Sequence, residues 1–178
     1  MDSIKNYSLQ EFLKQSPKVI EDYLNVLKHL EEGKLKTQLA DLTLREVELL
    51  KKSIDDEDEI INVVSIVEKL SEEQVLKLKI LEFFPLVKAI RSQLEKLIAR
   101  EENNLTPKFP DEKFELVEGG KRLQRFGIWN VVNSLAGGDI LKFDAILNLK
   151  YDKVFTKLLL DKELNDIQHE ISKRNKQY

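Results

Sequence analysis

The feature that most constrains the fold is a stripe of apolar residues separated alternately by four and three positions. Its members are Leu76, Ile80, Phe83, Val87, Ile90, Leu94 and Leu97. This heptad-like spacing keeps every member on one face of a helix for three repeats. Pro85 falls inside the stripe without changing its phase, so we expect one long helix over roughly 72–102, kinked near Pro85. Two helices that meet at Pro85 are the alternative.

Further helices are predicted from capping sequences. Ser16-Pro17 places an N-cap serine before a proline at the first helical position. Thr43 with Glu46, and Ser71 with Gln74, have the spacing of a capping box. Glycine (6) and proline (4) are scarce among the 178 residues, which argues against an all-β fold with many tight turns. These signals predict a mainly α fold, a helical bundle.

One small β-hairpin is expected between Phe114 and Phe126. Gly119-Gly120 lies in the middle of this segment, and two glycines supply the positive φ angles that a two-residue primed turn needs. A single hairpin is only marginally stable by itself. We therefore expect it to lean on helices or on a partner sheet.

Other glycines mark expected helix ends. Gly33 is predicted to end the helix that begins at Pro17, and Gly137-Gly138 to close a short helix over residues 128–135. A last helix is expected from about residue 152 towards residue 173. Its apolar stripe consists of Leu160, Leu164, Ile167 and Ile171.

The chain is expected to form two modules. Residues 103–111 contain two prolines and indicate a linker. The net charge is −5 over residues 1–105 and +2 over residues 106–178. We predict a helical module at 1–105 and a smaller module at 112–178, with the hairpin and the C-terminal helices, docked by opposite charge.

Composition argues against most enzyme chemistry. The chain has no cysteine, which excludes disulfides, thiolate metal sites and cysteine nucleophiles. His29 and His169 are the only histidines, and no phosphate-binding loop or Gly-x-Ser-x-Gly elbow is present. We therefore expect no enzyme activity, no catalytic residue, no cofactor and no metal. The net charge of −3 makes nucleic acid an unexpected partner.

Two charged clusters have a functional and a structural interpretation. The acidic run 55–59 could hold a divalent cation, but it lacks the spacing of an EF-hand, and a solvated helix start is favoured. Lys121-Arg122 and Arg125, beside Phe126 and Trp129, could contact phosphate and stack a base. A hairpin edge protected by charge is the favoured interpretation of this second cluster.

The long apolar stripe has two possible roles, which can coexist. It can bury against the protein's own helices, or it can receive a helix of another protein in the manner of a helix in a groove. Large aromatic residues are enriched at such interfaces. The candidate partner-binding residues are Leu76, Ile80, Phe83, Val87, Ile90 and Leu94, with Phe126 and Trp129 as anchors on the second module.

No targeting or membrane segment is expected. The sequence starts without a basic stretch followed by an apolar run, and its apolar runs are far shorter than the roughly 20 residues that span a bilayer. We expect a cytoplasmic protein without a membrane partner.

Two stretches together carry a family resemblance. The first includes Leu44-Arg-Glu-Val-Glu-Leu-Leu, Ile66-Val-Glu-Lys-Leu-Ser-Glu-Glu-Gln-Val and Phe83-Phe-Pro. The second, from Trp129 to Phe155, contains Gly-Asp-Ile-x-Lys-x-Asp followed by Leu-x-Tyr-x-x-Val-Phe. They cover about half of the chain, and they resemble tail-assembly chaperones and related morphogenesis proteins of tailed bacteriophages.

The resemblance implies a protein-binding role. Such chaperones are thought to coat the long apolar tape-measure protein before the tail forms, and the family carries no catalytic residues to transfer. Carried over, it predicts a factor in phage tail or virion assembly that acts in the host cytoplasm. Its partner would be a tape-measure or another tail protein, and a homo-oligomer stays open. The alternative is a permanent structural subunit of the virion, such as a connector, ring or baseplate element.

Overall fold

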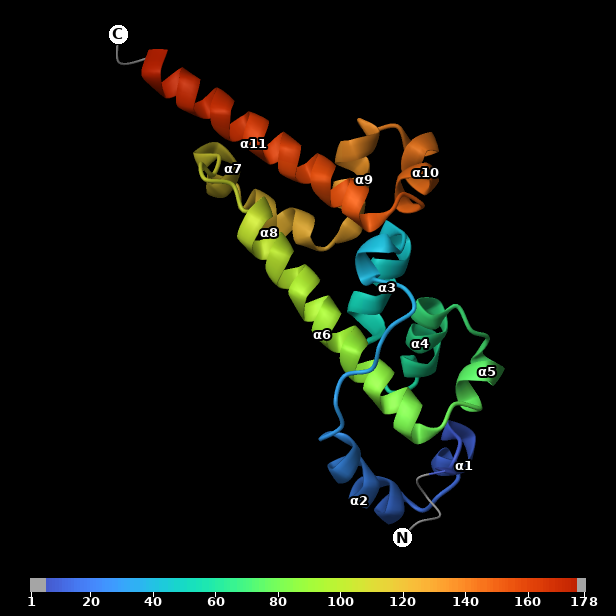
Figure 1. Ribbon diagram of the computed structural model, residues 1–178. Coiled ribbons are helices and arrows are strands. Elements are labelled where there is room, and N and C mark those ends of the chain that lie inside the picture. Colours follow the sequence, from blue (N-terminus) through green and yellow to red (C-terminus); the bar gives the residue numbers. More distant parts are fainter. Residues whose placement is uncertain (1–5, 176–178) are drawn as a thin grey trace. The chain divides into compact units, whose positions relative to one another are not determined.

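The computed structural model describes residues 6–175, which are mainly helical (Figure 1). The chain forms two compact units. Unit 1 comprises Met1–Leu42 and Leu49–Lys96, and unit 2 comprises Thr43–Glu48 and Leu97–Tyr178. Two of the three boundaries thus lie inside helices, α3 (Leu44–Ser53) and α6 (Ile80–Leu105), and the third directly precedes α3. The predicted modules at 1–105 and 112–178 stay a prediction, and the observed units divide at other residues.

Unit 1 is built from short helices around the first part of α6. In addition to α6 and the second half of α3, its elements are α1 (Leu9–Leu13), α2 (Pro17–Leu27), the 3-10 helix η2 (Leu39–Asp41), α4 (Ile60–Glu68) and α5 (Glu72–Leu76). Capping explains several of their starts. The hydroxyl of Ser71 accepts a hydrogen bond from the Gln74 N–H, and the Gln74 side chain accepts one from the Ser71 N–H, which confirms that predicted capping box. Proline at the first position of α2 is confirmed as well.

The long helix passes through Pro85 without interruption, which confirms continuity there, but it begins at Ile80. The predicted start at 72 is wrong, because residues 77–79 leave helical geometry. There the Leu9 N–H donates to the Leu78 carbonyl at 2.8 Å, and the Ile80 N–H donates to the Tyr7 carbonyl at 3.0 Å. The starts of α1 and α6 therefore supply partners for each other's unpaired backbone groups.

Gly33 has a different role from the predicted one. α2 ends at Leu27, before this glycine. The Gly33 N–H donates to the Pro85 carbonyl at 2.8 Å, and a Cβ on Gly33 would lie 3.0 Å from the Leu86 nitrogen. Glycine is thus used here for close approach of the 28–38 segment to α6.

Unit 2 contains the end of α6 and the C-terminal helices. Its other elements are the first half of α3, α7 (Glu112–Leu116), α8 (Gly119–Gln124), α9 (Ile128–Ala136), the 3-10 helix η3 (Ile140–Lys142), α10 (Phe143–Leu147) and α11 (Tyr151–Asn175). The Thr43–Glu46 capping box at the start of α3 is confirmed. The left-handed Gly137 (φ 62°) that ends α9 and the long final helix also match the prediction.

The predicted β-hairpin at 114–126 is wrong, because this segment forms α7 and α8 (Figure 1). The non-glycine residue Glu118 takes the left-handed conformation between them, with φ 52°. Gly119 begins α8 where the Phe114 ring packs on it, and a Cβ there would lie 2.3 Å from that ring. Gly119 thus provides space for an aromatic ring, and neither Gly119 nor Gly120 supplies the positive φ of a tight turn.

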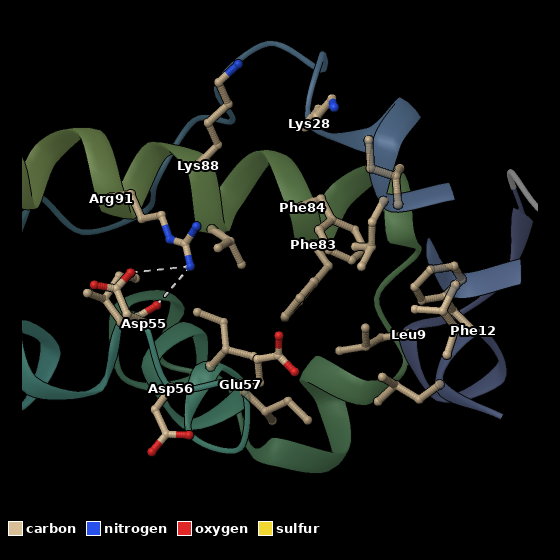
Figure 2. Close-up of a pocket in the computed structure, with 18 residues that line it drawn as sticks. Leu9, Phe12, Lys28, Asp55, Asp56, Glu57, Phe83, Phe84, Lys88 and Arg91 are labelled. Carbon is tan, nitrogen blue, oxygen red and sulfur yellow. Dashed lines mark hydrogen bonds and ion pairs between the residues drawn. The ribbon is translucent and has the colours of Figure 1, made fainter. Parts of the chain in front are cut away.

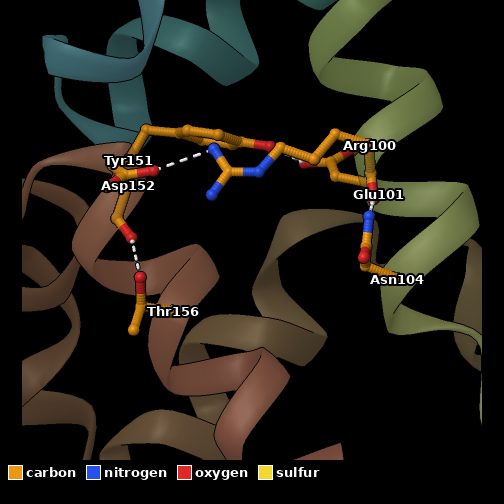
Figure 3. A network of polar contacts seen from close by, with 6 residues as sticks. All are labelled: Arg100, Glu101, Asn104, Tyr151, Asp152 and Thr156. Carbon is orange, nitrogen blue, oxygen red and sulfur yellow. Dashed lines mark hydrogen bonds and ion pairs between the residues drawn. The ribbon is translucent and has the colours of Figure 1, made fainter.

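A polar network connects α6 with α11 inside unit 2 (Figure 3). The Arg100 guanidinium lies 2.8 Å from an Asp152 carboxylate oxygen and also 3.8 Å from the centre of the Phe155 ring. The buried Tyr151 hydroxyl donates to Glu101 at 2.8 Å. Burial, and then this hydrogen bond to a carboxylate, raise the pKa of Tyr151 well above its usual range. Tyr151 therefore stays neutral and holds α11 to α6.

Candidate functional site: an apolar groove in unit 1

Unit 1 contains a groove of about 560 Å³, whose size is typical of ligand- and peptide-binding pockets (Figure 2). Residues of α1, α2, α6, the start of α4 and the turn between α3 and α4 form its walls. The apolar lining consists of Leu9, Phe12, Leu13, Ile20, Leu24, Leu27, Ile54, Ile60, Ile61, Phe83, Phe84 and Val87. The groove is therefore mainly a hydrocarbon surface.

Aromatic rings form the part of the groove where α1 meets α6. The Phe12 ring lies 5.9 Å from the Phe84 ring, and the Phe83 ring lies 5.4 Å from it, both in edge-to-face geometry. Such pairs stabilise their arrangement beyond simple burial. Phe12 and Phe83 are buried and Phe84 is half-buried. The ring cluster therefore gives the groove a preformed shape.

Two leucines at the edge of the groove are exposed. Leu13 ends α1 and Leu24 lies on α2, and each leaves a large part of its side chain in contact with solvent. A large apolar side chain beside a concave apolar surface is a common feature of binding sites for other molecules. Val26, also exposed on α2, does not line the groove. The two sides of α2 thus offer a comparison between groove and ordinary surface.

Cations from α6 fix two loops at the edge of the groove. Lys88 Nζ donates to the Leu30 carbonyl at 2.7 Å. Arg91 donates to the Ile54 carbonyl at 3.2 Å and lies 3.6 Å from an Asp55 carboxylate oxygen. In Figure 2 the two side chains leave the helix in different directions. The edge is therefore polar and held in place by hydrogen bonds, whereas the floor is apolar.

The acidic run at 55–59 lies before α4 and does not form its first turn, so the predicted helix start there is wrong. Asp55, Asp56 and Glu57 line the groove edge, and α4 begins at Ile60. The Asp56 carboxylate accepts a hydrogen bond from the Asp58 N–H at 3.0 Å and stabilises the turn. Within residues 6–175, no group of three or more histidine or acidic side chains is arranged to hold a metal ion.

The structure divides the six candidate residues of the stripe into three groups. Ile80, Ile90 and Leu94 are buried in the protein's own core, which favours the core alternative for them. Phe83 and Val87 are also buried, but they line the groove. The sixth candidate, Leu76, ends α5 and is half-buried.

The two predicted anchors, Phe126 and Trp129, belong to unit 2 and are not part of the groove. Both are about half exposed. The Arg125 guanidinium lies 4.8 Å from the centre of the Phe126 ring, and the Trp129 ring stacks on Phe143 with centres 5.9 Å apart. Partner binding by these two residues stays a prediction.

Sequence reasoning missed the residues that α1 and α2 contribute to the groove. The helical spacing of Ile20, Leu24 and Leu27 was visible in the sequence, but spacing does not tell which face stays open.

Within residues 6–175, no helix combines the length and the apolar character that a membrane span requires.

Comparison of the chain with protein-family models, with curated proteins and with solved structures found no match. The resemblance to phage morphogenesis proteins therefore rests on the two sequence stretches alone.

Proposed function

We propose that this protein is a non-enzymatic factor that binds a protein partner during assembly of a bacteriophage tail or virion. The partner places an apolar helix in the groove of unit 1. The observation that carries the proposal is the groove itself, with its hydrocarbon floor and with Leu13 and Leu24 exposed at its edge. A helix that presents apolar residues at every third or fourth position is the complementary ligand.

The size of the groove supports reversible binding. Burying a leucine or phenylalanine side chain contributes about 1.5–3 kcal/mol. Three such anchors from a partner helix contribute about 5–9 kcal/mol, against an association cost of about 4–15 kcal/mol. At most about 5 kcal/mol then remains, which corresponds to a Kd no tighter than roughly 0.2 mM, so three anchors in the groove support weak, reversible binding. Tight, permanent binding would need a larger interface.

The assignment to phage assembly rests on the resemblance of the two stretches, the first of which ends at the groove residues Phe83 and Phe84. On this proposal the protein acts in the host cytoplasm, and its partner is a tape-measure or another tail protein. The alternative is a permanent subunit of the virion. Mass spectrometry of purified virions distinguishes the two, because an assembly chaperone is absent from finished particles and a subunit is present at fixed copy number.

The groove is tested by replacing its exposed edge with charge. The variant L13D/L24D should fold, because both side chains are partly exposed, but an apolar helix would then meet two carboxylates that binding desolvates. We expect phage assembly, and co-purification of the tail partner from infected cells, to fail in this variant. V26D is the matched control on α2 and should behave as wild type. Normal assembly with folded L13D/L24D would refute the proposal.

A further inference from the structure

The last helix, α11, carries an apolar stripe on its surface. Its members are Leu160, Leu164, Ile167 and Ile171. Each leaves between 48% and 55% of its surface exposed. The spacings of four, three and four residues place all four on one face, over about 16 Å of helix. This is the d-a-d-a pattern of a helix that pairs with another helix.

The opposite face of α11 packs against the chain itself. The Lys108 N–H donates to the buried Asp166 carboxylate at 3.3 Å, and the Phe109 ring stacks on His169 with centres 4.5 Å apart. Lys173 Nζ lies 4.7 Å from the centre of the same ring. Since a helix turns by about 100° per residue, this face lies about 160° from the stripe. The stripe therefore points away from the loop that holds α11.

The positions that flank the stripe carry only one sign of charge. In the heptad pattern these e and g positions are Asp161, Glu163, Gln168 and Glu170. Asp161 is paired with Lys157, and Glu163 lies 2.8 Å from Lys162. The Lys157–Asp161 pair lies on the helix surface, where such pairs contribute little to stability. Lys162 is only 13% exposed and also lies 3.0 Å from the buried Asp166. Asp161 can therefore exchange Lys157 for a cation of a docked helix, and the half-exposed Glu163 carboxylate can accept another cation beside Lys162.

We propose that this stripe docks an amphipathic helix of another protein whose apolar stripe is flanked by lysine and arginine. A second copy of α11 is a less complementary partner. Antiparallel pairing sets Glu163 of one copy beside Glu170 of the other, and parallel pairing sets Glu163 beside the uncharged Gln168 of the other copy. An anionic membrane surface would be repelled by the same carboxylates. This surface lies on unit 2, so the inference does not depend on the groove of unit 1.

The test uses two synthetic 21-residue peptides with leucine at the a and d positions. One has lysine at all e and g positions and the other has glutamate. Fluorescence anisotropy with the full chain should detect binding of the lysine peptide and at least tenfold weaker binding of the glutamate peptide. L164S/I167S, which changes exposed residues only, should weaken binding of the lysine peptide by roughly tenfold.

The charge contribution is tested separately by E163Q/E170Q. Added salt should weaken binding of the lysine peptide to wild type several-fold, because salt screens the attraction between the peptide's lysines and the two carboxylates. The same salt should weaken binding to E163Q/E170Q much less, because this variant lacks those two charges. E31Q/E32Q makes the same charge change in an exposed segment of unit 1 and should behave as wild type. Equal binding of both peptides, no binding of the lysine peptide, or dimerisation of the wild type that L164S/I167S abolishes would overturn the proposal.

Discussion

Replacement of Ile90 by alanine tests whether the long apolar stripe is the protein's own core. Ile90 lies near the middle of α6 and is 0% exposed, whereas Ile98, on the same helix, is 37% exposed. The substitutions I90A and I98A remove the same side-chain atoms, each from a position within the same helix. Their difference in unfolding free energy therefore measures burial alone.

The expected magnitude follows from this burial. Isoleucine to alanine in a packed core costs about 2–5 kcal/mol, which is a large share of a total stability of about 5–15 kcal/mol. For a chain of this size each kcal/mol lowers the melting temperature by about 2–4 °C. I90A should therefore melt about 4–20 °C below wild type. I98A should change stability by less than about 1 kcal/mol, because its side chain is already partly hydrated and alanine favours the helix.

Thermal unfolding followed by far-UV circular dichroism measures both values. Equal melting temperatures for I90A and I98A would contradict the core role of Ile90, since Ile90 would then contribute no more than a surface residue. In that case the partner role predicted for the whole stripe, Ile90 and Leu94 included, would regain support. A large fall for I90A alone assigns this part of the stripe to the core and leaves Phe83 and Val87 as its groove-lining members.

Two further predictions concern unit 2. Burial acts to raise the pKa of the Asp166 carboxyl, but the hydrogen bond and charge of Lys162, 3.0 Å away, outweigh it and lower the pKa below its usual 3.8. The folded state then binds the proton less readily than the unfolded state, so the stability that the Asp166 carboxylate contributes should be lost as pH falls below 3.8. The melting temperatures of wild type and D166N should therefore converge in this acidic range. Melting curves between pH 7 and pH 2.5 that stay parallel would contradict it. G119A should lower the free energy of unfolding by about 1 kcal/mol, because the added Cβ displaces the Phe114 ring, and F114A should relieve that cost in the double variant. G120A should instead stabilise α8 by about 0.5–1 kcal/mol, because its Cβ meets no atom within 4 Å. Urea denaturation measures all three, and equal effects of G119A and G120A would exclude the proposed ring contact.

Local signals in the sequence predicted local structure well. Both predicted capping boxes, Ser71 with Gln74 and Thr43 with Glu46, form because their hydrogen bonds join residues three positions apart. The left-handed glycine after α9 is equally local. These features need no information about the rest of the chain.

Tertiary contacts determined the features that the sequence did not predict. α6 begins at Ile80 because backbone groups near its start bond to Tyr7 and Leu9, more than 65 residues away in sequence. Gly119 resembles a turn glycine, and only the Phe114 ring shows that it provides space. The same limit applies to the groove. Its floor residue Phe83 belongs to the predicted stripe, but the open side depends on how α1 and α2 approach α6.

On our proposal, the groove of unit 1 receives an apolar helix of an assembly partner. Site-specific photo-crosslinking in infected cells tests it most directly, with a benzophenone side chain at Leu24 in one variant and at Val26 in another. Both positions are exposed on α2, but only Leu24 lines the groove. We predict that the probe at Leu24 crosslinks to an apolar helical segment of one phage tail protein and that the probe at Val26 does not. Equal crosslinking from both positions, or none from Leu24, would contradict binding of a partner helix in the groove.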